Sequence, residues 1–186
     1  TIDGDVDLTN SATAVTTTGN TSSDASADLV EGLDLGGTTS AGGAATLTSG
    51  VDAAVTATSS ATTGDSDADV DVTGRMAGID SATVDVEGAL TATSTLDLDG
   101  TATASTNAGG VASADVQTDG GKAIEATTTT VEGAATISGV ARVDLVADAD
   151  SVNTAADATT NTTGDQSGVE ATTLTVKGNL GVTGSM

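Results

Sequence analysis

Residues 84–105 read VDVEGALTATSTLDLDGTATAS, and apolar or small side chains alternate with polar ones along most of this stretch. Such alternation is typical of a β-strand with one buried and one exposed face, whereas a helix needs apolar residues three and four positions apart. The stretch is also rich in Thr and Val, whose branched side chains suit a pleated sheet. We therefore expect an all-β protein.

The pattern returns at a fixed interval of 45 residues. The motif VEGA at residues 86–89 recurs as VEGA at 131–134 and as VKGN at 176–179, and a weaker copy, AGGA, stands at 41–44. Three aligned columns are uniform in all four copies: Gly43, Gly88, Gly133 and Gly178; Ala12, Ala57, Ala102 and Ala147; Thr1, Thr46, Thr91 and Thr136. A fixed period of this size is typical of stacked repeats, in which each unit buries its apolar face against its neighbours.

The fold class that follows is an all-β solenoid (a β-helix) with about four repeats and uncapped ends. The repeats cover approximately residues 1–40, 41–85, 86–130 and 131–175, and a fifth begins at 176–186. The alternating run is longer than an ordinary strand, so we expect it to bend at Gly88 and Gly100. We accordingly expect each repeat to make two or three coils.

Two polar clusters in each repeat predict turns. The first comprises Gly19-Asn20, Gly64-Asp65, residues 107–110 and Asn153-Thr154; the second comprises Gly36-Gly37, Gly74 with Gly78, residues 119–121 and Gly164-Asp165. In the first repeat the pair Leu33-Asp34 is one residue out of phase, which predicts a local slip of register between Val6 and Thr46.

The composition limits both the core and the partners. The 186 residues include no aromatic residue, His, Cys or Pro, so we expect a thin core between two closely spaced strand layers. The net charge of −23, from 27 acids and 4 bases, disfavours nucleic acid and membrane insertion and favours cations, basic surfaces and a salt-rich, halophilic setting. Without His or Cys the usual nucleophile–base pairs cannot be built, so we predict that the chain is not an enzyme.

Calcium is the one cofactor that the sequence suggests. Asp65, Asp67 and Asp69 form a D-x-D-x-D motif at a predicted turn, and Asp3, Asp5 and Asp7 form another. Hard cations need several oxygen ligands at once, which alternating acids in a turn can supply. The alternative is that these residues are simply the solvated face of a strand.

Two further surface features are candidate sites. Asn20 and Asn161 each begin an N-x-S/T triplet and are candidate glycosylation acceptors near turns. The runs Thr91-x-Thr93-x-Thr95 and Thr101-x-Thr103 resemble the T-x-T ladders of ice-binding β-solenoids, although acidic residues such as Asp97 and Asp99 interrupt them. The alternative is that Thr is merely a good exposed strand residue.

A second resemblance concerns the C-terminal stretch. Residues 174–184, LTVKGNLGVTG, resemble the strand-rich repeats of phage tail fibres and of large prokaryotic surface adhesins. The resemblance implies an extracellular fibre at a cell or virion surface. Because the first residue is Thr1, we expect a processed chain or a segment of a longer one.

The function predicted from these features is a structural subunit or segment of an extracellular filament, assembled by end-to-end strand stacking. Its partners would be copies of itself, head to tail, or the rest of a longer chain. The residues expected at the contact are Thr1, Ile2 and Val6 at one end and Leu174, Val176, Leu180 and Val182 at the other. The alternative is a calcium-dependent adhesion or ice-binding module.

Overall fold

The computed structural model describes residues 1–28, 31–73, 77–119, 121–152, 154–163 and 167–185, with residues 3, 5–10, 27, 28 and 31 described by their backbone alone. The described residues form strands and no helix. They therefore include no helix that could cross a membrane. The strands are β1 (Ile2–Thr16), β2 (Thr21–Asp28), β3 (Glu31–Ala41), β4 (Ala45–Thr63), β5 (Ser66–Thr73), β6 (Ala77–Val86), β7 (Leu90–Ala108), β8 (Ala112–Thr118), β9 (Lys122–Val131), β10 (Ala135–Ser151), β11 (Ala156–Thr162), β12 (Ser167–Val176) and β13 (Leu180–Ser185).

All strand pairs are parallel and join equivalent parts of successive repeats. Sheet A has the order β1-β4-β7-β10-β13, sheet B the order β11-β8-β5-β2 and sheet C the order β12-β9-β6-β3. In sheet A each residue pairs with the residue 45 positions further on, as Ile2 does with Leu47. One repeat is therefore one coil of a β-solenoid, which confirms the predicted fold class. The expectation of two or three coils per repeat was wrong.

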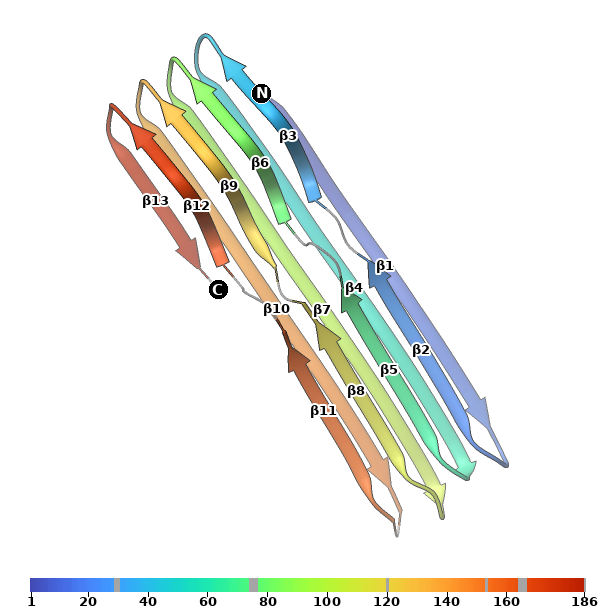
Figure 1. Cartoon of the computed structure of the whole chain (residues 1–186). Coiled ribbons are helices and arrows are strands. Elements are labelled where there is room, and N and C mark those ends of the chain that lie inside the picture. The colour runs from blue at the N-terminus through green and yellow to red at the C-terminus, as the bar shows by residue number, and fades with distance from the viewer. Residues whose placement is uncertain (29–30, 74–76, 120, 153, 164–166, 186) are drawn as a thin grey trace.

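The coil is wide and flat because its longest strand is straight. Sheet A forms one layer along the whole length of the molecule, and sheets B and C lie end to end opposite it, with their strands running back (Figure 1). β7 runs for 19 residues, about 63 Å at the usual rise, and passes through Gly100 without a break. The predicted bend at Gly100 was thus wrong. Gly88 does lie where the chain reverses, between β6 and β7.

The first predicted turn cluster is confirmed between sheets A and B, where Gly19, Gly64 and Gly109 adopt positive φ angles of 99°, 108° and 67°. Glycine reaches this left-handed region at no steric cost. In the second cluster, Gly36 and Gly37 lie inside β3 and Gly78 inside β6, so they were wrongly predicted as turns. Asp119 and Gly121 do lie between β8 and β9, as predicted. Gly74, Gly120, Gly164 and Asp165, like Asn153 of the first cluster, lie outside the described residues.

The register departs from 45 residues between some of the described strands. β3 pairs with β6 at an offset of 46 residues up to Leu35 and of 45 from Thr38 onwards, so Gly36 and Gly37 form a bulge. This confirms the slip predicted for the first repeat. β5 and β8 also pair at an offset of 46, because the turn before β8 contains one extra residue.

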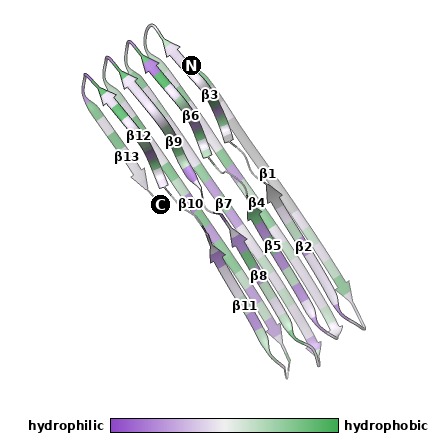
Figure 2. Cartoon of the chain, in the orientation of Figure 1, coloured by the Kyte–Doolittle hydropathy of each residue, from purple (hydrophilic) through white to green (hydrophobic). Residues whose placement is uncertain are grey.

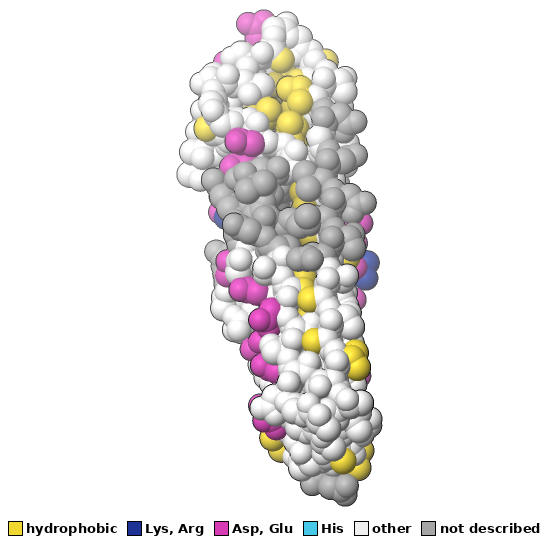
Figure 3. Space-filling model, turned by 90° about the vertical axis from the view of Figure 1, so that its right-hand side faces the viewer, with side chains coloured by type: hydrophobic (Ala, Val, Ile, Leu, Met, Phe, Trp, Pro, Cys, Tyr) yellow, Lys and Arg dark blue, Asp and Glu magenta, His cyan; other side chains and the backbone are white. Residues whose placement is uncertain are grey.

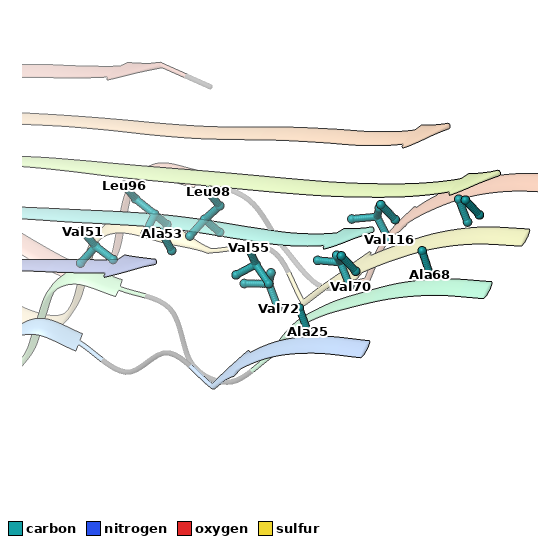
Figure 4. Packing of buried hydrophobic residues seen from close by; sticks show 14 of the residues in the cluster. Ala25, Val51, Ala53, Val55, Ala68, Val70, Val72, Leu96, Leu98 and Val116 are labelled. Atoms are coloured by element: carbon teal, nitrogen blue, oxygen red, sulfur yellow. The ribbon is translucent and has the colours of Figure 1, made fainter. Parts of the chain in front are cut away.

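The interior is divided into two apolar cores. Hydropathy changes from residue to residue along the strands (Figure 2). Buried and less buried positions alternate along β7, so one set of its side chains lies between the layers. The A–B core, between sheets A and B, includes Leu96, Leu98, Val70, Val72 and Val116, and Figure 4 shows these side chains pointing into the space between the layers. The A–C core, between sheets A and C, comprises Leu47, Ile79, Val84, Val86, Leu90, Ala92, Ile124, Val131, Ala135 and Ile137.

A band of very small residues, which we call the waist, separates the two cores. On sheet A it comprises Gly4, Ser49, Ser94, Gly139 and Gly184, and opposite them lie Gly32, Gly78, Ala123 and Gly168. A Cβ added at Gly32 would lie 2.5 Å from Ser49 Oγ, and one added at Gly168 would lie 2.6 Å from the Gly139 carbonyl oxygen. The layers therefore approach each other closely here, backbone against backbone at Gly139 and Gly168 and backbone against a serine side chain at Gly32 and Gly78.

The waist predicts an unusual intolerance of alanine. In Gly78→Ala the new methyl group would overlap the Ser94 side chain and lie 2.7 Å from the Ala123 carbonyl oxygen. We expect this variant to lose about 1–3 kcal/mol of unfolding free energy, the usual cost of overpacking. The matched control is Gly37→Ala, whose methyl group would meet nothing within 4 Å. Chemical denaturation of both variants measures the difference, and equal stabilities would contradict the close approach of the layers.

Candidate functional site

The two end faces of the solenoid expose the apolar cores. At the first coil, partly buried apolar side chains pack against the cores from one side only: Ala12, Leu33, Leu35 and Ala41. At the fourth coil the corresponding residues are Val143, Leu145, Ala147, Ala149, Val169, Leu174 and Val176. Figure 3 views the molecule from the side of β1 and β2, where hydrophobic side chains run along the seam between the layers. Within the described residues nothing covers either seam.

Strand edges are unpaired at the same places. β13 pairs with residues 135–140 of β10, and the rest of β10 has no described strand beyond it. β11 and β12 are likewise the last strands of sheets B and C, and β1, β2 and β3 are the first strands of the three sheets. Unpaired parallel edges offer rows of backbone N–H and C=O groups to a further strand.

The residues predicted for assembly lie at these ends. Thr1, Ile2, Leu180 and Val182 are exposed, and Leu174 and Val176 are half-buried in β12, whereas the side chain of Val6 lies outside the described residues. Ile2 and Val182 occupy the first and last positions of a single column in sheet A, which runs through Leu47, Ala92 and Ile137. The structure thus assigns equivalent positions to the two ends, while their role in assembly stays a prediction.

Acidic side chains form columns along the outer surface, because in-register stacking repeats them from coil to coil. On sheet B, Asp24, Asp69 and Asp115 are direct neighbours. On sheet C the column comprises Asp34, Asp80, Glu125 and Glu170. Adjacent strands are about 4.8 Å apart, so like charges in a column repel each other.

Cations relieve some of this repulsion. Lys122 Nζ lies 3.1 Å from Glu125 Oε1 and 3.0 Å from Glu170 Oε2. Partial burial lowers the pKa of Lys122, but the hydrogen bonds with Glu170 and Glu125 outweigh this effect and raise the pKa above its usual value. The pKa of Asp69 is raised by partial burial and by the neighbouring charges of Asp67, Asp24 and Asp115.

The residues predicted to bind calcium do not converge on one point. Asp65 lies in a turn, where its carboxylate accepts hydrogen bonds from Asn20 Nδ2 (3.2 Å) and from the backbone N–H of Val111 (2.9 Å). Asp67 and Asp69 lie half-buried on the outer face of β5. Among the described residues no group of three or more acidic side chains is arranged to hold a metal ion. The carboxylates of Asp3, Asp5 and Asp7 lie outside the described residues, and calcium binding stays a prediction.

The two candidate glycosylation sites are exposed but differ in their contacts. Asn20 exchanges hydrogen bonds with the next coil, since its Oδ1 accepts from the backbone N–H of Asp65 at 3.1 Å and its Nδ2 donates to Asp65 Oδ2. Asn161 is exposed on β11, the outermost strand of sheet B. A glycan at Asn20 would use the nitrogen that now bonds to Asp65, so Asn161 is the less constrained acceptor. Modification at either residue stays a prediction.

Threonines form two blocks on the outer face of sheet A. One block contains the columns Thr46–Thr91–Thr136 and Thr48–Thr93, and the other contains Thr56–Thr101 and Thr58–Thr103. The charged residues Asp52, Asp97, Asp99, Arg142 and Asp144 lie between the blocks. The regular hydroxyl array expected of a single ice-binding face is therefore divided in two.

One basic residue of the outer face was missed from the sequence. Arg142 occupies the same column as Asp7, Asp52 and Asp97, and it reverses the charge of that column in the fourth coil. Its Nη1 lies 3.6 Å from Asp97 Oδ2 and its Nη2 lies 3.6 Å from Asp144 Oδ2. The signal was present in the 45-residue alignment, where the four basic residues are the exceptions to acidic or neutral columns.

Comparison with known proteins adds no assignment, because no family model, curated protein or solved structure matches this chain. The end faces and the charged columns are therefore interpreted from their own geometry.

The acidic columns predict that stability rises as the pH falls. The pKa of Asp99, like that of Asp69, is raised, in this case by partial burial and by the charge of Asp97. A raised pKa means that the folded state binds the proton of the carboxyl group more tightly than the unfolded state does. The destabilisation present at pH 7 is relieved as the pH falls through the raised folded pKa, and it is gone below the unfolded value of about 3.9.

In Asp69→Asn we expect the melting temperature at pH 7 to rise by about 2 °C and to change less between pH 7 and pH 4. The control is Asp71→Asn, an exposed residue whose column neighbours are Ser26 and Gln117. Thermal unfolding monitored by circular dichroism measures both. A melting temperature of the native chain that falls between pH 7 and pH 4 would contradict the electrostatic account.

Calcium binding has its own test. If Asp65, Asp67 and Asp69 bind the ion, millimolar Ca²⁺ should raise the melting temperature and a chelator should reverse the effect, because a ligand of the folded state stabilises it. Na⁺ and Mg²⁺ at matched ionic strength separate binding from screening, and Asp67→Asn should abolish the Ca²⁺-specific part. An equal effect of all three cations would show that the acids form only a screened surface.

Proposed function

We propose that this chain is a structural segment of an extracellular fibre, in which coils continue to stack end to end beyond the four that the chain forms. The observation that carries the proposal is that two apolar cores extend through the stack and that apolar side chains remain only partly buried on both end faces. Apolar surface exposed in this way is stabilised when a further coil covers it. The next coil comes from a second copy of the chain or from the rest of a longer chain.

The two ends are suited to each other. Every coil of a solenoid contributes one strand to each sheet in the same arrangement. The first coil of one copy can therefore take the place of a fifth coil on top of the fourth coil of another copy. Joining them is a heterologous contact, which produces an open filament when it does not close into a ring. The column of Leu47, Ala92 and Ile137 would continue at the joint through either Val182 of one copy or Ile2 of the next, because these two residues fall at the same register position.

The surface supports an extracellular, salt-exposed setting, since an excess of carboxylates keeps a fibre soluble where salt screens their repulsion. The proposal assigns no reaction to the chain. Calcium-dependent adhesion and ice binding are not proposed, because the three predicted calcium ligands do not converge and the threonine face is split by charged residues.

Concentration-dependent assembly tests the proposal. We expect sedimentation velocity to show species that grow with concentration, and electron microscopy to show rods one coil wide. In Leu145→Lys, a charge enters the half-covered core at the fourth coil, so the chain should shift to monomers. Val146→Lys is the matched control, because Val146 is the next residue of β10 but its side chain is on the outer face, 47% exposed.

Two outcomes contradict the proposal in different ways. A chain that stays monomeric at high concentration and high salt would exclude stacking between copies and leave continuation within a longer chain. Equal assembly of the Leu145→Lys and Val146→Lys variants would show that the exposed core is not the contact surface. Circular dichroism of both variants confirms that each is folded.

A further inference from the structure

The column that contains Arg142 changes from acidic to basic in its last member. Asp52 and Asp97 lie on the outer face of sheet A in the second and third coils, at the register position that Arg142 occupies in the fourth coil and the backbone of Asp7 in the first. The position of Asp7 follows from the backbone pairing of β1 with β4. The column therefore begins with an acid at one end of the solenoid and ends with a base at the other.

Within the described part of the chain, Arg142 interacts with carboxylates of its own and the preceding coil. Its ion pairs, to Asp97 and Asp144, both measure 3.6 Å, and its side chain remains 62% exposed. β13 does not reach it, since β13 pairs with residues 135–140. On the side where a fifth coil would stand, no described residue faces the guanidinium group, whose planar set of donors can bind carboxylates on two sides at once.

The charge of the whole stack is graded in the same direction. The first coil, residues 1–44, contains seven acids and no Lys or Arg, whereas the fourth, residues 135–179, contains six acids together with Arg142 and Lys177. A joint between the fourth coil of one copy and the first coil of another thus brings a coil with two bases against one with none. Joints between two first coils would bring only acids together, and like charges at an interface are costly.

We propose that Arg142 sets the polarity and the register of the joint between two copies, by binding Asp7 of the incoming copy while it retains Asp97 of its own. This inference rests on the proposed function, and it names the interaction that makes stacking head-to-tail. In the assembled fibre the column would read Asp, Asp, Asp, Arg without interruption. Each Arg142 would then lie between two carboxylates, one in the preceding coil and one across the joint.

The joint has a geometric requirement. Residues 182–185 of the first copy and residues 2–5 of the second fall at equivalent register positions, so one of these segments leaves the sheet when the copies meet. Residue 6 belongs to the buried column of Val51 and Leu96, so residue 7 is the first position of the incoming β1 beyond this overlap that falls in an outer-face column. The Arg142–Asp7 pair can therefore form whichever of the two segments leaves the sheet. It is the first such contact between the copies along the outer face of sheet A.

Complementation between two charge-reversed variants tests the pair. In Arg142→Asp every joint sets two carboxylates against each other, and in Asp7→Arg every joint sets two guanidinium groups against each other. Each variant alone should associate at least about tenfold more weakly than the native chain at ~0.15 M salt. An equimolar mixture can pair the substituted end of one variant with the substituted end of the other, and these joints restore opposite charges. The mixture should therefore regain association.

The mixture separates association from folding. Each variant carries the same substitution, and any folding defect that it causes, both alone and in the mixture, so a gain of association in the mixture comes from the joints. Lys177→Glu is the control. Lys177 binds Glu132 at 2.6 Å, but its column offers Gly42 in an incoming first coil, so this variant should lose little association. Sedimentation velocity of the native chain, the three variants and the mixture gives the association constants.

Each outcome is decisive. Association lost in both charge-reversed variants and regained in the mixture supports the pair. If the native chain associates but the mixture is no better than the single variants, the Arg142–Asp7 pair is excluded while the fibre proposal stands. If the native chain does not associate under any condition, stacking between copies fails, and the pair fails with it.

Discussion

Each side chain in this solenoid stands about 4.8 Å from its own counterparts in the neighbouring coils, and this spacing is the constraint on which the rest of the structure depends. In-register stacking makes the nearest neighbours of a residue the residues about one repeat away in the sequence. A favourable choice, such as Val70 beside Val116, is repeated in the stack. An unfavourable one, such as Asp69 between Asp24 and Asp115, is repeated as well, which explains why the few bases matter out of proportion to their number.

The same constraint explains how a core without aromatic side chains is filled. Ala, Val, Leu and Ile span only a short distance, so the layers must lie close together, and at the waist they meet through Gly78 and Ser94. The glycine column at the turns between sheets C and A has a related cause. The backbone N–H of Gly88 donates to the carbonyl of Gly43 at 3.1 Å, and a Cβ at Gly88 would lie 2.5 Å from the carbonyl carbon of Gly43.

The sequence predicted the architecture well where it is periodic. The 45-residue interval identified the stacked partners, and alternation identified which face of each strand is buried, as at Leu96 and Leu98. It did not show that one repeat is one coil, since alternation looks the same in a straight strand and in one bent at Gly100. Gly36 and Gly37 were mistaken for a turn because a bulge and a turn use the same residues. Columns of like charge followed from the repeat, but the open side of Arg142 required the arrangement of β10 and β13.

The direction of the hydrogen bonds has a mechanical consequence. Backbone bonds between coils run along the stack, so a pull on the two ends loads every bond of one interface at the same moment. Sheet A, with strands of up to 19 residues, carries about half of that load, and sheets B and C, whose strands β5 and β6 have 8 and 10 residues, share the rest. A molecule of this shape would resist tension along its axis as a bundle of parallel springs resists stretching. It would bend more readily perpendicular to the sheets, because only two thin layers resist bending in that direction.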